Sequence, residues 1–357
     1  MFELLGRRCI PGIRKPGVLR AGAFLLLIGV TRLPAEPDLT ILQPDIQRVF
    51  DQAKAAIVRI TAEDEHGRLA GSGFFIDPSG TIYTSYTIGG ETRDIVVEFG
   101  SNRYPAQRLV SDRRSNLAIL KISATTPWLQ VSQSDGLKVA TPVMAIGYPM
   151  NLPPTPNFGI VGGIDKKYLD GYFPIALIRA NLSIQRGEIG APLVNLKGDA
   201  VGIVLSTVGD RTACYVLPIK VAEKIHTDYM RFGEIRPGWI GAATEDSGSP
   251  KHDSTAVIKE IAPGSPAANA GLQIGDVVLR IGKAEIHEAP DIPDASFFIT
   301  AQEDVPITVF RDGKKVTLTV TAIDHPDYGV QHAPLIAPGR PVNQENAFRD
   351  SLHLEKN

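Results

Sequence analysis

Hydrophobic residues in this chain come mostly in short runs that are separated by residues favouring turns. From residue 57 onward the runs are rich in Val, Ile and Leu, with Gly, Pro, Asp and Asn between them. Short strands with regular turn signals are typical of a sandwich or a pair of barrels and argue against βαβ units. We therefore predict strands at 57–60, 73–76, 95–99, 117–122, 143–146, 176–178 and 201–205.

Two segments are expected to form helices instead, and in the first of them the apolar residues recur with the helical period. The first is 44–55, and the second is 221–230, which precedes a linker with Gly and Pro at 232–238. Beyond this linker, apolar residues alternate with threonines over 316–321, which predicts a strand with one buried face. The linker therefore divides the chain into two folded units.

The N-terminus has the pattern of an export signal. Several Arg and Lys residues precede an apolar run at 21–30, and Leu33-Pro34-Ala35 offers a small residue for cleavage. A bilayer span needs about 20 apolar residues, more than this run contains. We expect a signal peptide at 1–35 and an exported protein in the periplasm or cell envelope. An uncleaved anchor, or a buried element of the mature protein, is the alternative.

Composition excludes some partners. The 357 residues carry a formal net charge of −2, so there is no basic excess to neutralise the phosphates of a nucleic acid. The two cysteines are Cys9 and Cys214, and removal of the signal would leave Cys214 without an intramolecular disulfide partner. We expect no metal site and no small-molecule cofactor. The polar residues 324–357 lack periodicity and predict a flexible tail.

Several short motifs resemble, in order, those of the HtrA (DegP-like) family of trypsin-like serine proteases with one PDZ domain. The resemblance covers roughly residues 45–322. It implies a mainly β fold, with a chymotrypsin-like double β-barrel at 36–230 and a C-terminal, β-sandwich-like PDZ domain with helices at 237–323. The motifs include Gly71-Ser72-Gly73, Leu117-Ala118-Ile119, Ala145-Ile146-Gly147-Tyr148-Pro149 and Tyr215-Val216-Leu217-Pro218.

The family's catalytic triad is altered at all three positions. Thr87 stands at the position of the histidine, Asn116 at that of the aspartate and Ile189 at that of the serine, with family-like spacing. Threonine cannot exchange protons near neutral pH as imidazole does, and isoleucine has no nucleophilic atom. These differences predict a chain that is not an enzyme, a degenerate pseudoprotease.

The residues around the serine position support the same prediction. Gly187 of the oxyanion loop is retained, but Glu188 places a carboxylate where negative charge would develop. Ser183 and Cys214 are nearby nucleophiles, and we interpret both as ordinary structural side chains.

The second unit keeps the features of a peptide-binding PDZ domain. By this resemblance, a carboxylate-binding loop and the strand after it form one side of the groove, and a helix at 293–300 borders the other. The alternative is a PDZ domain whose groove is closed by packing. The peptide-binding residues are predicted to be Trp239, Ile240, Gly241, Ala242, Ala243 and Thr244.

The favoured hypothesis is an inactive HtrA-like protein that binds C-terminal or unfolded polypeptides, as a chaperone-like holder, an adaptor or a regulatory subunit. The resemblance adds a homo-trimer, or assembly with active relatives, as the expected oligomer. The alternative function is an HtrA-family serine endopeptidase of protein quality control that uses unconventional residues. A structural remnant without a ligand is a third possibility.

Overall fold

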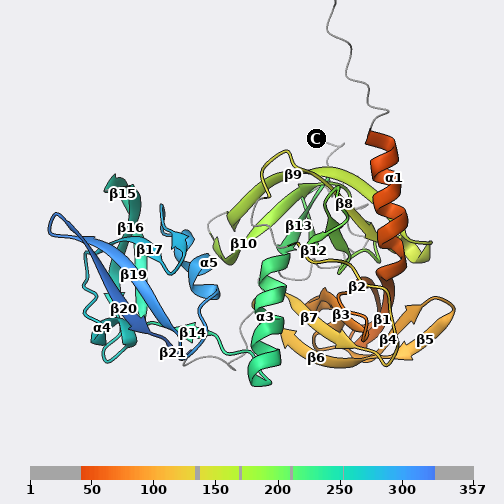
Figure 1. Ribbon diagram of the computed structural model, residues 1–357, viewed down its shortest axis with the longest axis horizontal. Helices are drawn as coiled ribbons and strands as arrows, with labels where there is room; N and C mark the ends of the chain where they lie inside the picture. Colours follow the sequence, from red (N-terminus) through yellow and green to blue (C-terminus); the bar gives the residue numbers. More distant parts are fainter. Residues whose placement is uncertain (1–41, 133–136, 169–170, 210–211, 252, 326–357) are drawn as a thin grey trace, which may run out of the picture. The chain divides into compact units, whose positions relative to one another are not determined.

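The computed structural model describes residues 42–132, 137–168, 171–209, 212–251 and 253–325 (Figure 1). Within these ranges the chain forms two β units, followed by a third β-rich domain from Gly238 onward. The mainly β organisation that the apolar runs predict is therefore confirmed. The signal predicted at 1–35 and residues 326–357 of the predicted tail lie outside the described residues.

None of the helices in these ranges has the length and apolar character that crossing a bilayer requires.

The first β unit is an antiparallel sheet of seven strands. The strands are β1 (Ile57–Asp64), β2 (Gly67–Phe75), β3 (Thr81–Ser85), β4 (Arg93–Phe99), β5 (Asn102–Pro105), β6 (Gln107–Asp112) and β7 (Leu117–Lys121). Their order in the sheet is β5-β4-β1-β2-β3-β7-β6. Phe74, Tyr83 and Ile119 from three adjacent strands are completely buried, because side chains at alternate positions share one face of a strand.

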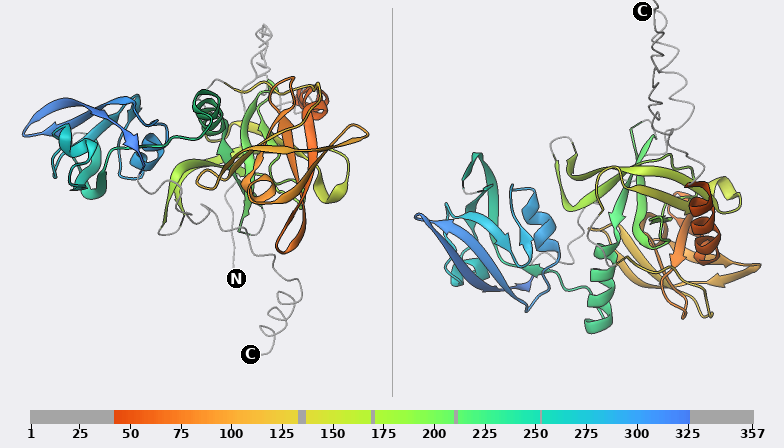
Figure 2. Two further views of the ribbon diagram at one scale, coloured as in Figure 1. Left: turned by 90° about the horizontal axis from the view of Figure 1, so that it is seen from below. Right: turned by 45° about the horizontal axis from the view of Figure 1, so that its top comes forward.

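The second β unit is a closed barrel, and Figure 2 shows its strands, in yellow-green to green, curving around a common core. The strands are β8 (Pro142–Gly147), β9 (Thr155–Tyr168), β10 (Gly171–Asn181), β11 (Pro192–Val194), β12 (Ala200–Val208) and β13 (Ala213–Pro218). The strand order is β10-β13-β12-β11-β8-β9, and the pairing of β9 with β10 closes it into a barrel. The connection from β10 to β11 carries positions 187–189.

Helices complete the two β units. They are α1 (Leu42–Ala53), α2 (Tyr86–Gly89) and α3 (Ile219–Phe232), with short 3-10 turns at Lys54–Ala56 and Pro149–Asn151. Both long helices were predicted, each within a few residues of its bounds. Gly233 caps the C-terminus of helix α3, and its left-handed backbone (φ 75°) lets its N–H bond to the Tyr229 carbonyl at 2.8 Å.

The C-terminal domain is built on a sheet in which β15, β16, β17, β19 and β20 follow one another, with β18 paired to β17. A separate pair joins β14 to β21, so the first and last strands of the domain lie side by side. The elements are β14 (Gly238–Trp239), β15 (Ala242–Lys251), β16 (Ser254–Ile261), α4 (Pro266–Asn269), β17 (Val277–Ile281), β18 (Ala284–Glu285), α5 (Asp291–Phe297), β19 (Asp304–Arg311), β20 (Lys314–Thr321) and β21 (Ile323–Asp324).

One predicted element of this domain is misplaced. The helix expected at 293–300 is α5, which begins at Asp291 and ends at Phe297. Pro293 fits the first turn of a helix, where its missing N–H is not needed, so the helix can begin before it. At the other end the chain leaves the helix because Thr300 forms a β-bridge with Pro237.

An ion pair inside this domain fixes the β19–β20 hairpin. The Asp276 carboxylate is almost completely buried and accepts two hydrogen bonds from the Arg311 guanidinium, both at 2.6 Å. This bidentate geometry is the strong form of such a pair.

Candidate functional site

The loop between β10 and β11 is pinned to both β units by its backbone. The Ile189 carbonyl accepts a hydrogen bond from the Ser72 N–H of β2 at 2.8 Å, and the Gly190 N–H donates to the Val204 carbonyl of β12 at 2.8 Å. Gly190 has φ 87°, and a Cβ there would lie 2.2 Å from the Ser72 oxygen. Only glycine fits this position, so Gly190 sets the turn that presents residue 189.

The Ile189 side chain occupies the junction of the two β units. It is half-buried and packs against an apolar cluster of each unit. Ile88 belongs to one of these clusters and adjoins Thr87 in the chain. A hydrocarbon side chain at this point contributes packing and has no atom that can attack a carbonyl.

Glu188 is completely buried, and its carboxylate is engaged by its surroundings. One oxygen accepts from the Asn157 side-chain amide and the other from the Gln185 N–H, both at 2.6 Å. Burial raises the pKa of this carboxyl, while the two hydrogen bonds oppose that shift. The carboxylate therefore holds the loop to β9 and to its own backbone.

Thr87 and Asn116 meet through Ser85, the N-cap of α2. The Ser85 hydroxyl accepts from the Thr87 N–H at 3.1 Å and donates to the Asn116 side-chain oxygen at 3.2 Å. Asn116 is almost completely buried, has φ 59° and also accepts the Tyr86 N–H at 2.9 Å through its carbonyl. The structure thus brings the three predicted triad positions to one junction, where Asn116 supports the start of α2.

The two other nucleophiles have different surroundings. Cys214 on β13 is completely buried, and burial raises the pKa of its thiol to about 12, so it stays protonated at neutral pH. Ser183 is exposed on the connection after β10. In the part of the chain that the structure describes, the Gly187 and Ile189 N–H groups have no hydrogen-bond acceptor, so two amide donors remain at the loop.

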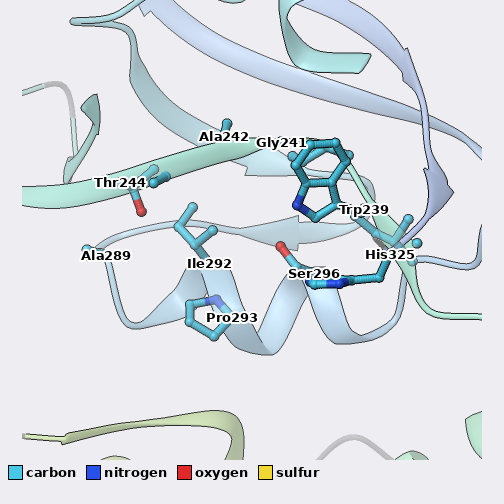
Figure 3. A pocket seen from close by; sticks show the side chains of 13 residues that line it. Trp239, Gly241, Ala242, Thr244, Ala289, Ile292, Pro293, Ser296 and His325 are labelled. Atoms are coloured by element: carbon cyan, nitrogen blue, oxygen red, sulfur yellow. The ribbon is translucent and has the colours of Figure 1, made fainter. Parts of the chain in front are cut away.

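The C-terminal domain contains a groove of about 330 Å³ between β15 and α5 (Figure 3). All six predicted peptide-binding residues line it, from Trp239 to Thr244. The opposite wall is mainly apolar and includes Ile292, Pro293 and Ile299. In the sheet order β15 has a neighbour on one side, β16, so its other edge can pair with an added strand.

Gly241 shapes the loop at one end of the groove. Its φ is 79°, and a Cβ there would lie 2.4 Å from the Ser265 Cβ and 2.8 Å from the Trp239 ring. The Gly241 carbonyl accepts from the Ala262 N–H and the Ile240 carbonyl from the Ala267 N–H, so the loop is anchored from behind.

Sequence reasoning missed part of the groove. Ala289 and Ile292 lie before the helix as it was predicted, and His325 lies within the predicted tail. The misplaced start of α5 explains Ile292, whereas Ala289 lies on the connection just before that helix. A single histidine after the last strand carries no sequence signal that would place it at a groove.

Comparisons with known proteins agree with this architecture. The family model of the trypsin-like peptidase domain matches residues 71–203, and that of the PDZ domain matches residues 238–322. The chain has the HtrA arrangement, a trypsin-like peptidase domain followed by one PDZ domain. The predicted resemblance and fold class are confirmed.

Two curated relatives and two solved structures illustrate the similarity of this HtrA-like chain. Probable periplasmic serine endoproteases, DegP-like, from Ectopseudomonas mendocina and Halomonas elongata are 28% and 31% identical over 85% and 74% of the chain. The chain spans 67% and 58% of their lengths. The HtrA-type protease AlgW with a tripeptide has a TM-score of 0.67 at 23% identity, over 79% of this chain and 97% of that one. A serine endoprotease from Yersinia pestis has a TM-score of 0.59 at 24% identity, and the match covers 78% of this chain and 98% of that one.

These comparisons contradict the prediction that the chain is not an enzyme. The relatives are named serine endoproteases, and no comparison shows that this chain has lost such an activity. The replaced residues at 87, 116 and 189 are real features of the site, but inferring inactivity from them went beyond what they establish. The periplasmic names of the relatives support the predicted export.

Proposed function

We propose that this HtrA-like chain binds extended polypeptides in the groove of its PDZ domain, in the periplasm or cell envelope. The observation that carries the proposal is the edge of β15 that faces α5 across the groove and pairs with no strand of the described residues. An added peptide strand gains main-chain hydrogen bonds along this edge, and the apolar wall takes its side chains. C-terminal or unfolded segments of other proteins are the ligands we propose.

The loop at the end of the groove favours peptides that end there. Backbone N–H groups in a tight turn supply positive potential for a terminal carboxylate without a basic side chain in the loop. The structural neighbour AlgW was solved with a tripeptide and with a decapeptide, which supports peptide binding by this fold. We further propose a homo-trimer, or assembly with related chains, as the working state.

The test measures binding of a fluorescent peptide with a free C-terminal valine to the full chain, together with its C-terminal amide. We expect the amide to bind about tenfold more weakly, because it loses a charge-assisted interaction. Gly241→Val should abolish binding, because its side chain would overlap Ser265 and Trp239.

The matched control is Gly248→Val on β15. Gly248 also has positive φ (72°), but a Cβ there meets no atom within 4 Å. Equal binding of the acid and the amide would refute carboxylate capture. Binding by Gly241→Val at the unchanged level would place the peptide elsewhere.

Serine-type endopeptidase activity in protein quality control is the second candidate function. It is favoured by the names of the relatives and by the two amide donors, Gly187 N–H and Ile189 N–H, that remain at the loop. Such donors stabilise the anion that forms during acyl transfer. The nucleophile would have to be a group other than the Ile189 side chain, and the base a group other than the Thr87 and Asn116 side chains.

Cleavage of casein by the purified chain tests this candidate. Thr87→Trp places a bulky side chain at the junction, and Thr317→Trp on the exposed side of β20 is the control. Cleavage that Thr87→Trp removes and Thr317→Trp keeps would support an endopeptidase at this junction. Cleavage that neither variant changes would come from a contaminating protease, and absence of cleavage would reject the candidate.

A further inference from the structure

We propose that His325 recognises the terminal carboxylate of a peptide in the PDZ groove and makes binding tighter when its imidazole is protonated. This inference rests on the proposed peptide-binding function and adds a specificity-determining residue to it.

The fold places His325 at the loop end of the groove. It follows directly after β21, which pairs with β14, and its N–H donates to the Pro237 carbonyl at 3.2 Å. The imidazole meets the Trp239 indole edge to face, with 6.4 Å between ring centres. In Figure 3, Trp239, Ser296 and His325 lie together at one end of the groove, and Thr244 and Ala289 lie at the other.

The chemistry of the lining singles out this residue. Thirteen residues line the groove, and among them His325 is the one whose side chain can change charge between about pH 5 and pH 8. Every other lining residue is apolar or carries a neutral polar group. A peptide carboxylate at this end therefore meets backbone amides and a single titratable side chain.

Charged groups on the adjoining elements are engaged with other partners or lie off the groove. Asp324 on β21 forms a bidentate pair with Arg236, with contacts of 2.7 and 2.9 Å, and Glu234 lies 3.9 Å from the same guanidinium. Asp291 on α5 accepts the His287 and Glu288 N–H groups, and Glu303 accepts the Thr300 N–H. Asp294 is also on α5, and neither it nor Asp291 lines the groove.

The direction of the effect follows from charge. A peptide carboxylate is ionised throughout this pH range, whereas an imidazole gains its proton as pH falls through about 6.5. The protonated ring donates a charge-assisted hydrogen bond to the carboxylate, which the neutral ring does not. Binding of a free-acid peptide should therefore tighten as pH falls, and binding of its amide should not.

The experiment uses the full chain and a fluorescent peptide that ends in valine and has no other group titrating in this range. Its affinity is measured at about pH 5.5 and pH 8 by anisotropy, beside that of the C-terminal amide. We expect the acid to bind about fivefold to tenfold more tightly at the lower pH, within the usual range of coupling between two sites, and the amide to bind equally at both.

Three variants assign the effect. At both pH values, H325Q should bind the free-acid peptide with the weaker affinity that the unchanged chain has at pH 8. H325K should bind it at both pH values with the tighter affinity that the unchanged chain has at pH 5.5. H287Q is the control, because His287 is exposed in the same domain but does not line the groove. It should keep the full pH dependence.

The outcomes separate this inference from the proposed function. The role of His325 is overturned if the pH dependence persists in H325Q, or if the amide peptide shows the same pH dependence as the free acid. In either case the proposed peptide binding stands. If neither peptide binds the folded chain at either pH, the proposed function fails and the inference fails with it.

Discussion

Gly190 and Gly241 each hold a left-handed backbone, with φ of 87° and 79°, at a turn that presents a loop. At Gly190 the space that a Cβ would need is taken by Ser72 and Thr84, and the residues before it in the loop are the half-buried Ile189 and the buried Glu188. At Gly241 the crowding comes from the supporting Ser265 and the Trp239 ring, and the far side of the loop opens on a groove.

The comparison shows that a left-handed glycine turn does not by itself define what a loop can do. The side chains around the turn decide whether it faces packed apolar groups or a space that a ligand can enter. In the PDZ domain the turn borders a groove, and its lining residues are the ones that the proposed peptide recognition would use. At the junction loop the turn is surrounded by packed side chains, and the amide N–H groups of Gly187 and Ile189 have no acceptor among the described residues.

The largest effect is expected from Gly190→Ala. Its Cβ would clash with the Ser72 carbonyl, and alanine also resists positive φ, so the free energy of unfolding should fall by about 2–5 kcal/mol. Gly100→Ala is the control, since Gly100 has φ 61° with no atom within 4 Å of an added Cβ, and it should cost about 1–2 kcal/mol. Urea unfolding followed through Trp128 in a Trp239→Phe background measures both.

Similar losses in the two glycine variants would show that the junction loop relaxes around the new methyl group. The junction would then resemble an open site more than a packed one.

An intermediate effect is expected from Ile189→Ser. The half-buried side chain packs against both β units, so its removal should lower the free energy of unfolding by about 1–2 kcal/mol. Ile164→Ser on β9 is the matched control, because that side chain is 42% exposed and should change stability by less than about 0.5 kcal/mol. If the two variants unfold at the same urea concentration, Ile189 contributes no more packing than a surface residue.

The smallest effect concerns the pH dependence that Glu188 contributes. Burial raises its pKa above the ordinary value of 4.5, so the folded chain holds this proton more tightly than the unfolded chain. From 4.5 up to the raised pKa, the free energy of unfolding therefore falls as pH rises. Glutamine does not titrate, so Glu188→Gln should lack this fall, and the stability of the variant relative to the unchanged chain should rise with pH across this range.

Urea midpoints from about pH 4.5 to pH 7 measure this difference. Glu65→Gln at an exposed position is the control and should leave the slope unchanged. A slope for Glu188→Gln that matches the unchanged chain would mean that the carboxylate is solvated in solution.

Much of the fold was predictable because its signals are local. Each predicted strand and both long helices are present, since alternation and helical periodicity reflect which face a residue buries. The bounds of α5 could not be predicted in this way, because its end depends on a β-bridge between Thr300 and Pro237, which are far apart in sequence.

The sites divide in the same way. The six groove residues from Trp239 to Thr244 are contiguous, so a motif could locate them. His325 reaches the groove through the pairing of β21 with β14, which no motif encodes. Replaced side chains at 87, 116 and 189 could be seen in the sequence, but whether hydrolysis occurs depends on the whole site and on the substrate.

The pairing of β14 with β21 has a consequence for engineering. The domain's entry and exit strands are neighbours in one small sheet, so its ends meet at a single place. Such a domain can be inserted into a surface loop of an unrelated host without forcing the host's chain apart. It can also be circularly permuted by a short link between these ends and a new opening at the exposed Asp312-Gly313 turn, with the groove left intact.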